Sequence, residues 1–212
     1  MLELFLKSVF IGLSIAAPVG PIGLLCIQRT LEHGRVVGLA TGLGAAFADA
    51  VYGAVGALGL SAVLALLIGA RTGLALAGGA FLVWLGVTTV AKARRGARAA
   101  QAGDAGGRAP SPGRAFATTF LLTLSNPMTI LSFVAVFASL AGSTARLSGA
   151  AQAVMVVGVL VGSALWWGVL TTAVALFRRR LSDGALAAIR AASGGLVAGF
   201  GLWQLAGVLV GG

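Results

Sequence analysis

A run of apolar residues longer than any soluble core helix dominates the first half of the chain. Between Val36 and Ala91 only Asp49 and Arg71 carry charge. A helix needs about 20 apolar residues to cross a bilayer once, so this run allows more than one crossing. Of all 212 residues, 58% are hydrophobic and 9% are charged, whereas soluble domains carry about 25% charged residues. The sequence therefore predicts an all-α membrane protein and excludes an ordinary soluble domain.

Six segments of the chain are apolar and long enough to be membrane spans. The stretch 61–70 is too short to cross a membrane alone, and we assign it to the end of the second span. We predict spans at about residues 4–27, 36–60, 72–91, 115–140, 150–177 and 186–209.

One segment between the predicted spans differs in composition from all the others. Residues 94–114, "RRGARAAQAGDAGGRAPSPGR", are rich in glycine, alanine, proline and arginine and show no apolar periodicity. Such a composition is typical of a flexible linker. We therefore predict a single transmembrane domain over 1–212, with repeat one at 1–93 and repeat two at 115–212.

The basic residues predict the orientation of the chain. Twelve of the 15 fall in the loops between spans one and two, three and four, and five and six. By the positive-inside rule these loops are cytoplasmic, so both termini face outward. The net charge of +10 is then a topology signal, and we expect no nucleic-acid partner.

The two halves of the chain resemble each other, and each opens with a proline inside a span. "SIAAPVGPIGLL" (14–25) opens the first half and "TLSNPMTILSF" (123–133) opens the second, while "ADAVYG" (48–53) resembles "SALWWG" (163–168). Three spans per half would give the halves opposite orientations. Inverted repeats with matching broken helices are the best sequence indication of a transporter's substrate site.

The prolines predict a break in the first helix of each repeat. Proline inside a helix costs about 3 kcal/mol, yet Gly20-Pro21 and Asn126-Pro127 are each a good helix start. Two half-helix N-termini, with free N–H groups, would then lie near the bilayer centre and bind a carboxylate. The candidate residues are Pro18, Gly20, Pro21, Asn126 and Pro127. The alternative is that these prolines only kink packed helices.

Asp49 is the acidic residue that falls within a predicted span. It follows Val36 by 13 residues, about 20 Å along a helix. An intramembrane acid is a functional candidate, and Asp49 is predicted to bind a substrate ammonium group or the exchanged proton. Its structural alternative is a neutral carboxyl bonded to a neighbouring helix. Tyr52 and Trp167 occupy matching places in the repeats and are candidate cavity residues, although core or lipid-facing positions suit them equally.

Other kinds of chemistry find no support in the sequence. The lone cysteine, Cys26, excludes an intramolecular disulfide and a multi-cysteine metal site. The glycine-rich stretch 42–53 lacks the lysine of a phosphate-binding loop, and no nucleophile, base and acid can be grouped. We expect no enzyme activity, no cofactor and no bound metal. Small residues spaced by four along the second span permit close helix packing, and would permit a homodimer: Gly34, Gly38, Gly42, Ala46, Ala50 and Ala54.

Two longer stretches resemble the lysine exporter (LysE) family, which includes the homoserine/threonine exporter (RhtB) branch. They are "APVGPIGLLCIQRTLEHGRVVGLATGLGAAFADAVYG" (17–53) and "FLLTLSNPMTILSFVAVF" (120–137), supported by "LAGGAFLVWLGV" (76–87). The chain has "APVGP" where the commoner family form is "PGPN". The resemblance implies a multi-pass protein of the bacterial inner membrane that is a secondary exporter of an amino acid or related metabolite, acting by proton exchange. The alternatives are a metal-cation exporter of the wider superfamily, or a non-transporting membrane partner that interacts through residues 92–114.

Overall fold

The computed structural model describes residues 1–18, 20–58, 69–99, 110–139, 148–178 and 182–210. Within these ranges all regular secondary structure is helical, as predicted. The helices are α1 (Leu2–Ala16), α2 (Pro21–His33), α3 (Arg35–Ala57), α5 (Arg71–Ala99), α6 (Pro112–Leu124), α7 (Pro127–Ser139), α8 (Gly149–Arg178) and α9 (Asp183–Val210).

Four helices are long and apolar enough to cross a membrane, namely 35–57, 72–91, 149–178 and 184–208. The pair α1 and α2 is bent by 80°, and the pair α6 and α7 by 62°. The described residues therefore form four such helices, or up to six if each bent pair is one span. Both predicted helix breaks are present, at the ends of α1 and α6.

The helices next to the predicted linker are longer than expected. α5 continues to Ala99, because the arginines and alanines of 94–99 favour a helix. α6 begins at Pro112, and its N-cap Ser111 accepts a hydrogen bond from the Arg114 N–H at 3.3 Å. Helices thus enter the predicted linker from both sides. Residues 100–109, and 61–68 of the stretch assigned to the second span, lie outside the described residues.

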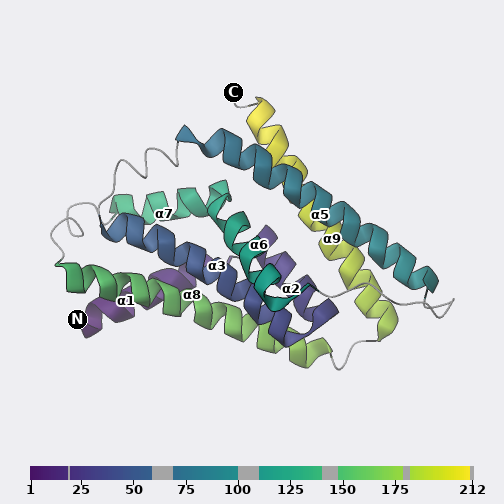
Figure 1. The fold of residues 1–212 in the computed structure, drawn as a ribbon, viewed down its shortest axis with the longest axis horizontal. Coiled ribbons are helices and arrows are strands. Elements are labelled where there is room, and N and C mark those ends of the chain that lie inside the picture. The colour runs from purple at the N-terminus through teal and green to yellow at the C-terminus, as the bar shows by residue number, and fades with distance from the viewer. Residues whose placement is uncertain (19, 59–68, 100–109, 140–147, 179–181, 211–212) are drawn as a thin grey trace.

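The packing centres on α3 and α8, which lie against each other (Figure 1). α1 packs along α8, whereas α6 packs along α3. α5 and α9 pair with each other beside this group, and α2 lies against α3, α8 and α9. The first half-helix of each half of the chain therefore packs on a long helix of the other half.

The predicted strip of small residues on the second span is used inside the chain. A Cβ atom at Gly38 would overlap Thr30 of α2, and one at Gly42 would overlap Trp167 of α8. Helices that approach this closely need glycine at the contact. The strip therefore packs α3 against α2 and α8, and a homodimer stays a prediction.

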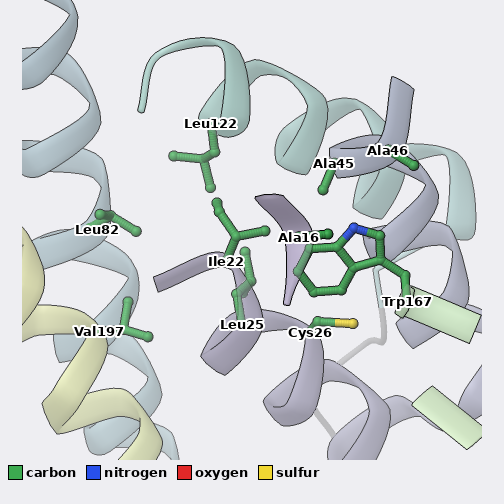
Figure 2. Close-up of a cluster of buried hydrophobic side chains, with 10 residues drawn as sticks. All are labelled: Ala16, Ile22, Leu25, Cys26, Ala45, Ala46, Leu82, Leu122, Trp167 and Val197. Carbon is green, nitrogen blue, oxygen red and sulfur yellow. The ribbon is translucent and has the colours of Figure 1, made fainter. Parts of the chain in front are cut away.

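Two buried clusters form the core. One surrounds Cys26 and Trp167, with the Leu122 side chain of α6 directed toward Ile22 of α2 (Figure 2). The other gathers residues from α3, α7 and α8, including Tyr52 and Phe133.

Candidate functional site

A cavity of about 290 Å³ lies between the two helix breaks. Its wall takes residues from α1, α2, α3, α6, α7, α8 and α9 and from both breaks. These residues are Ile15, Ala16, Pro18, Gly20, Pro21, Ile22, Gly23, Ala45, Asp49, Thr123, Asn126, Met128, Thr129, Ser132, Trp167, Phe200 and Trp203.

Six of the eight residues proposed from the sequence line this cavity: Pro18, Gly20, Pro21, Asn126, Asp49 and Trp167. The side chain of the seventh, Pro127, lies outside the described part of the chain, although its backbone begins α7.

Tyr52, the eighth, has a place in the core instead. Its hydroxyl donates to the Leu124 carbonyl at 2.6 Å, and its ring stacks on Phe133 with 5.3 Å between ring centroids. Tyr52 is 2% exposed and is not among the residues that line the cavity. Its hydroxyl satisfies a carbonyl at the end of α6, where the helix has no N–H left to offer.

The first break leaves the start of α2 without a side-chain cap. The N-cap is Gly20, which has no side chain to accept a hydrogen bond, and Pro21 at the first helical position has no N–H. The Gly20 carbonyl accepts from the Leu24 N–H at 3.0 Å. The N–H groups of Ile22 and Gly23, the next donors, belong to residues in the cavity wall. The first N–H groups of a helix have no partner within it, and this end is therefore suited to an anion.

The second break is capped by the side chain of Asn126. The Asn126 Oδ1 atom accepts from the Met128 N–H at 3.1 Å, which confirms the predicted N-cap. The Asn126 N–H donates to the Thr123 carbonyl at 3.1 Å. Backbone groups on both sides of this break thus have partners inside the protein.

Asp49 is buried in the cavity wall and bonded to α8. Its Oδ2 atom accepts from the Ser163 hydroxyl at 2.7 Å, and that hydroxyl accepts from Trp167 Nε1 at 3.1 Å. If Asp49 had only a structural role, its carboxyl group would be bonded to a neighbouring helix, as it is. If Asp49 takes part in transport, it has to line the cavity, and it does so as well. The two observations are compatible.

Sequence reasoning missed four polar residues of the site: Thr123, Thr129 and Ser132 in the cavity wall, and Ser163, which bonds Asp49. Ser163 stands at the start of "SALWWG", the stretch matched to the Asp49 segment, which was the available signal. Thr123 opens the motif that contains Asn126. Thr123 is 3% exposed, and its Oγ1 atom has no hydrogen-bond partner.

Asp49 is the one ionisable side chain among the residues found to line the cavity. Cys26 lies outside that wall and donates its S–H to the Gly38 carbonyl at 3.5 Å. In the described ranges, no three His, Cys, Asp or Glu side chains are grouped so that they could hold a metal ion.

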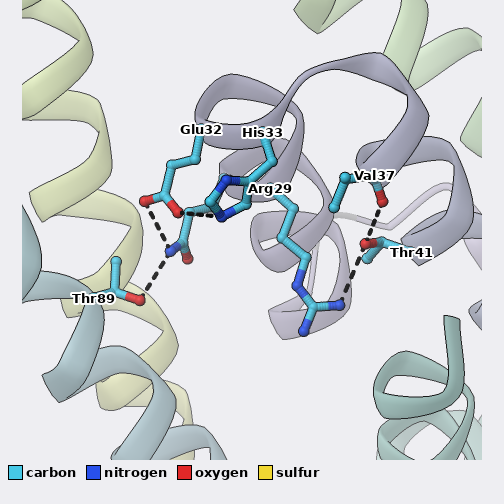
Figure 3. A network of polar contacts seen from close by, with 7 residues as sticks. Arg29, Glu32, His33, Val37, Thr41 and Thr89 are labelled. Atoms are coloured by element: carbon cyan, nitrogen blue, oxygen red, sulfur yellow. Dashed lines mark hydrogen bonds and ion pairs between the residues drawn. The ribbon is translucent and has the colours of Figure 1, made fainter. Parts of the chain in front are cut away.

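Beyond the cavity, the end of α2 is tied to α3 and α6 through Arg29. The Nη1 atom of this buried residue donates to Thr41 Oγ1 at 3.3 Å, as Figure 3 shows. The same atom donates to the Ala115 carbonyl and to Thr119 Oγ1, each at 3.0 Å. A guanidinium group presents its donors in a fixed planar fork, so Arg29 fixes the position of α2 against both helices.

A second contact ties α2 to α5. Gln28 Nε2 donates to Thr89 Oγ1 at 2.9 Å and to Glu32 Oε1 at 3.2 Å, and Glu32 lies 3.4 Å from His33 Nε2 (Figure 3). The end of α2 is therefore anchored on two sides.

Comparisons with known proteins agree with this architecture. The chain is 29% identical over 203 residues to a Bacillus subtilis protein provisionally named amino acid efflux protein YcgF, covering 95% of each chain. It is 31% identical over 170 residues to the Pseudomonas aeruginosa chemotactic transduction protein ChpE, covering 78% of this chain and 79% of that protein. It is also 31% identical over 112 residues to the uncharacterized membrane protein YahN of Escherichia coli, covering 52% and 48%. No solved structure matches significantly.

The family model of the LysE type translocator matches residues 13–206. This match covers both helix breaks, the cavity and all four membrane-length helices almost completely. Translocators are transporters, which agrees with the expectation that the chain is not an enzyme. The apolar helices and the family match together indicate a multi-pass protein of the inner membrane, and the chain belongs to the LysE type translocator family.

Proposed function

We propose that the protein is a secondary-active exporter that moves an amino acid, or a similar zwitterionic or cationic metabolite, out of the cell in exchange for protons. The observation that carries this proposal is that one cavity joins the uncapped start of α2 to the buried carboxyl group of Asp49. An amino acid carries a carboxylate and an ammonium group, so it needs both kinds of partner in one place.

The substrate carboxylate binds at the start of α2. Pro21 opens the helix at the cavity, and the partial positive charge of a helix N-terminus attracts anions. No basic side chain is found in the described cavity wall, so the N–H groups of α2 take the place that an arginine would have elsewhere. Broken helices serve anionic substrate groups in this way in other transporters.

Asp49 binds the substrate ammonium group or the exchanged proton. Its carboxylate accepts one hydrogen bond, from Ser163, and has further lone pairs for a cation. When a proton from the outer side occupies the carboxyl group, the negative charge that holds the ammonium group is gone. The substrate leaves outward, and the proton is released inward when the next substrate binds.

Transport also requires the site to open to each side in turn. The first half-helix of each half packs on a long helix of the other half, α1 on α8 and α6 on α3. This packing supports two inverted repeats of three spans that rock about the cavity. Opening toward the predicted cytoplasmic side would separate α2 from α6, and Arg29 bonds these helices.

The alternatives are weaker on the same observations. A metal cation needs several oxygen, sulfur or imidazole ligands, and Asp49 is the one anionic group in the described cavity wall. A non-transporting partner would agree with the name of the Pseudomonas aeruginosa relative, but it has no need of a cavity between broken helices that contains a buried carboxyl group.

The test is efflux from proteoliposomes loaded with an equimolar mixture of the twenty labelled L-amino acids, with the outside made acidic. The wild type is expected to release at least one amino acid faster than empty liposomes do. Efflux by Asp49→Asn should no longer depend on the proton gradient, and its rate should be at least tenfold lower than that of the wild type. Glu3→Gln is the matched control, because Glu3 is exposed and lies outside the cavity wall.

Two results would count against these assignments. Proton-coupled efflux that is unchanged in Asp49→Asn would remove Asp49 from the mechanism. If no amino acid leaves with the wild type, the amino-acid proposal is wrong, and metal cations would be assayed under the same gradient.

A further inference from the structure

We propose that Thr123 is a substrate-binding residue whose hydroxyl donates a hydrogen bond to the substrate carboxylate, beside the first N–H groups of α2. This inference rests on the proposed function, because it assumes that a carboxylate occupies the cavity. It adds a side chain from the second half of the chain to a site otherwise formed by backbone groups of the first.

The hydroxyl of Thr123 differs from the other buried threonine hydroxyls. The Thr89 hydroxyl accepts from Gln28 Nε2 at 2.9 Å. Thr30, Thr41, Thr119 and Thr171 each donate to the carbonyl four residues earlier in their own helix, at 2.7–2.9 Å. This is the ordinary way for a helix to satisfy a buried hydroxyl. The Thr123 Oγ1 atom is equally buried and makes no hydrogen bond.

A buried polar group without a partner is rare in native proteins and requires an explanation. Thr123 lines the cavity, so this unpartnered hydroxyl belongs to a residue of the cavity wall. A hydroxyl is both a donor and an acceptor, which leaves the identity of the partner to the surrounding groups.

The surroundings favour a carboxylate. Thr123 lies on the last turn of α6, and its neighbour Leu122 packs with Ile22 at the start of α2 in one buried cluster (Figure 2). The end of α6 and the start of α2 therefore lie together at the cavity. A carboxylate at the start of α2 would therefore occupy the cavity whose wall includes Thr123.

The start of α2 also has fewer donors than an ordinary helix N-terminus. Pro21 has no N–H, and no side chain caps this end. A carboxylate accepts up to about four hydrogen bonds, and the described cavity wall contains no cation for it. A hydroxyl that donates to an ionised oxygen forms a short, strong hydrogen bond, so Thr123 supplies a donor that the helix start lacks.

The experiment compares Thr123→Val, Thr123→Ser and Thr171→Val in proteoliposomes. The probe is the amino acid that the wild type exports fastest from the labelled twenty-component mixture. Valine has the shape of threonine without the hydroxyl, and serine keeps the hydroxyl. Thr171→Val makes the same change at a buried threonine outside the cavity wall.

We expect Thr123→Val to raise the half-saturating concentration about tenfold, the usual effect of losing a hydrogen bond to a charged group. The maximal rate should stay within twofold, because the bond is made to the bound substrate before transport. Thr123→Ser and Thr171→Val should stay within twofold of the wild type in both quantities.

Thermal unfolding without substrate distinguishes a binding role from a structural one. Thr123→Val removes an unpaired buried hydroxyl, so its melting temperature should equal or exceed that of the wild type. A lower melting temperature together with an unchanged half-saturating concentration would show that the hydroxyl has a structural partner, and would overturn the proposal.

The primary amide of the same amino acid, used as a competitor, tests the carboxylate. The preference of the wild type for the acid over the amide should shrink severalfold in Thr123→Val. An unchanged preference would mean that the hydroxyl binds another group or only water, and would overturn the assignment. Absence of efflux from the wild type would instead overturn the proposed function, and this inference with it.

Discussion

The two helix breaks look alike in sequence but differ in how their backbone groups are satisfied. The first lies between Ala16 and Pro21, bends the chain by 80° and begins α2 with a glycine N-cap that has no side chain. The second occupies residues 125 and 126, bends the chain by 62° and begins α7 with Asn126, which caps its own helix. The first break therefore leaves the N–H groups of Ile22 and Gly23 for a ligand, whereas the Met128 N–H at the second break is already bonded to Asn126.

This difference suggests a division of labour between the halves of the chain. The second break is also fixed from outside by Tyr52, which bonds the Leu124 carbonyl. It acts as a rigid support that contributes to the cavity through side chains such as Thr123. The first break contributes its backbone, and in the proposed mechanism its helix α2 separates from α6 when the site opens.

The largest expected effect comes from blocking the first break. A Cβ atom at Gly20 would have no atom within 4 Å, and the φ angle of −101° suits any residue. Gly20→Leu should therefore fold normally, with a stability change within about 0.5 kcal/mol, yet its side chain would fill the space before α2. We expect export to fall at least tenfold in the efflux assay, with an unchanged melting temperature.

Asn126→Ala is the matched variant at the second break, and it should show the opposite pattern. Loss of an N-cap costs about 1 kcal/mol, which lowers the melting temperature of a chain of this size by about 2–4 °C. Export should fall by threefold at most. If Asn126→Ala abolishes export at full stability, both breaks bind the ligand and the division of labour is wrong.

A smaller effect is expected from releasing α2 at its other end. Arg29→Met removes three hydrogen bonds that join α2 to α3 and α6. Cys26, one turn earlier on α2, is fully buried and is the single cysteine of the chain, so its reaction with a maleimide reports the separation of α2. We expect several-fold faster labelling in Arg29→Met than in the wild type.

Arg35→Met is the control for the labelling experiment, because Arg35 is exposed at the start of α3. Its labelling rate should equal that of the wild type. If Arg29→Met also labels at the wild-type rate, the Arg29 contacts do not hold α2 closed, and a movable α2 loses its main support.

The features that could be predicted from the sequence are those that local chemistry decides. Apolar length determined the four membrane-length helices, and proline with its preceding glycine or asparagine determined both breaks. The place of Asp49 inside a membrane-length helix followed from its distance to the start of that helix. Each of these inferences needs the properties of one segment only.

The features that could not be predicted depend on which residue of another helix lies opposite. Ser163 bonds Asp49 from α8, and the unpartnered state of Thr123 is visible only when its whole environment is known. The matching places of Tyr52 and Trp167 suggested equal roles, yet only Trp167 lines the cavity. An approximate repeat preserves positions along the chain better than it preserves the direction of each side chain.

Tyr52→Phe gives the smallest expected effect and tests that last point. The variant keeps the ring that stacks on Phe133 but loses the hydrogen bond to the Leu124 carbonyl, at a cost of about 1 kcal/mol. If the second break is a rigid support, the melting temperature should fall by about 2–4 °C, while the half-saturating concentration for export stays within twofold. A tenfold rise in that concentration at an unchanged melting temperature would instead place the Tyr52 hydroxyl on the substrate, as the sequence first suggested. The second break would then open during transport, since only a displaced Leu124 would free this hydroxyl for the cavity.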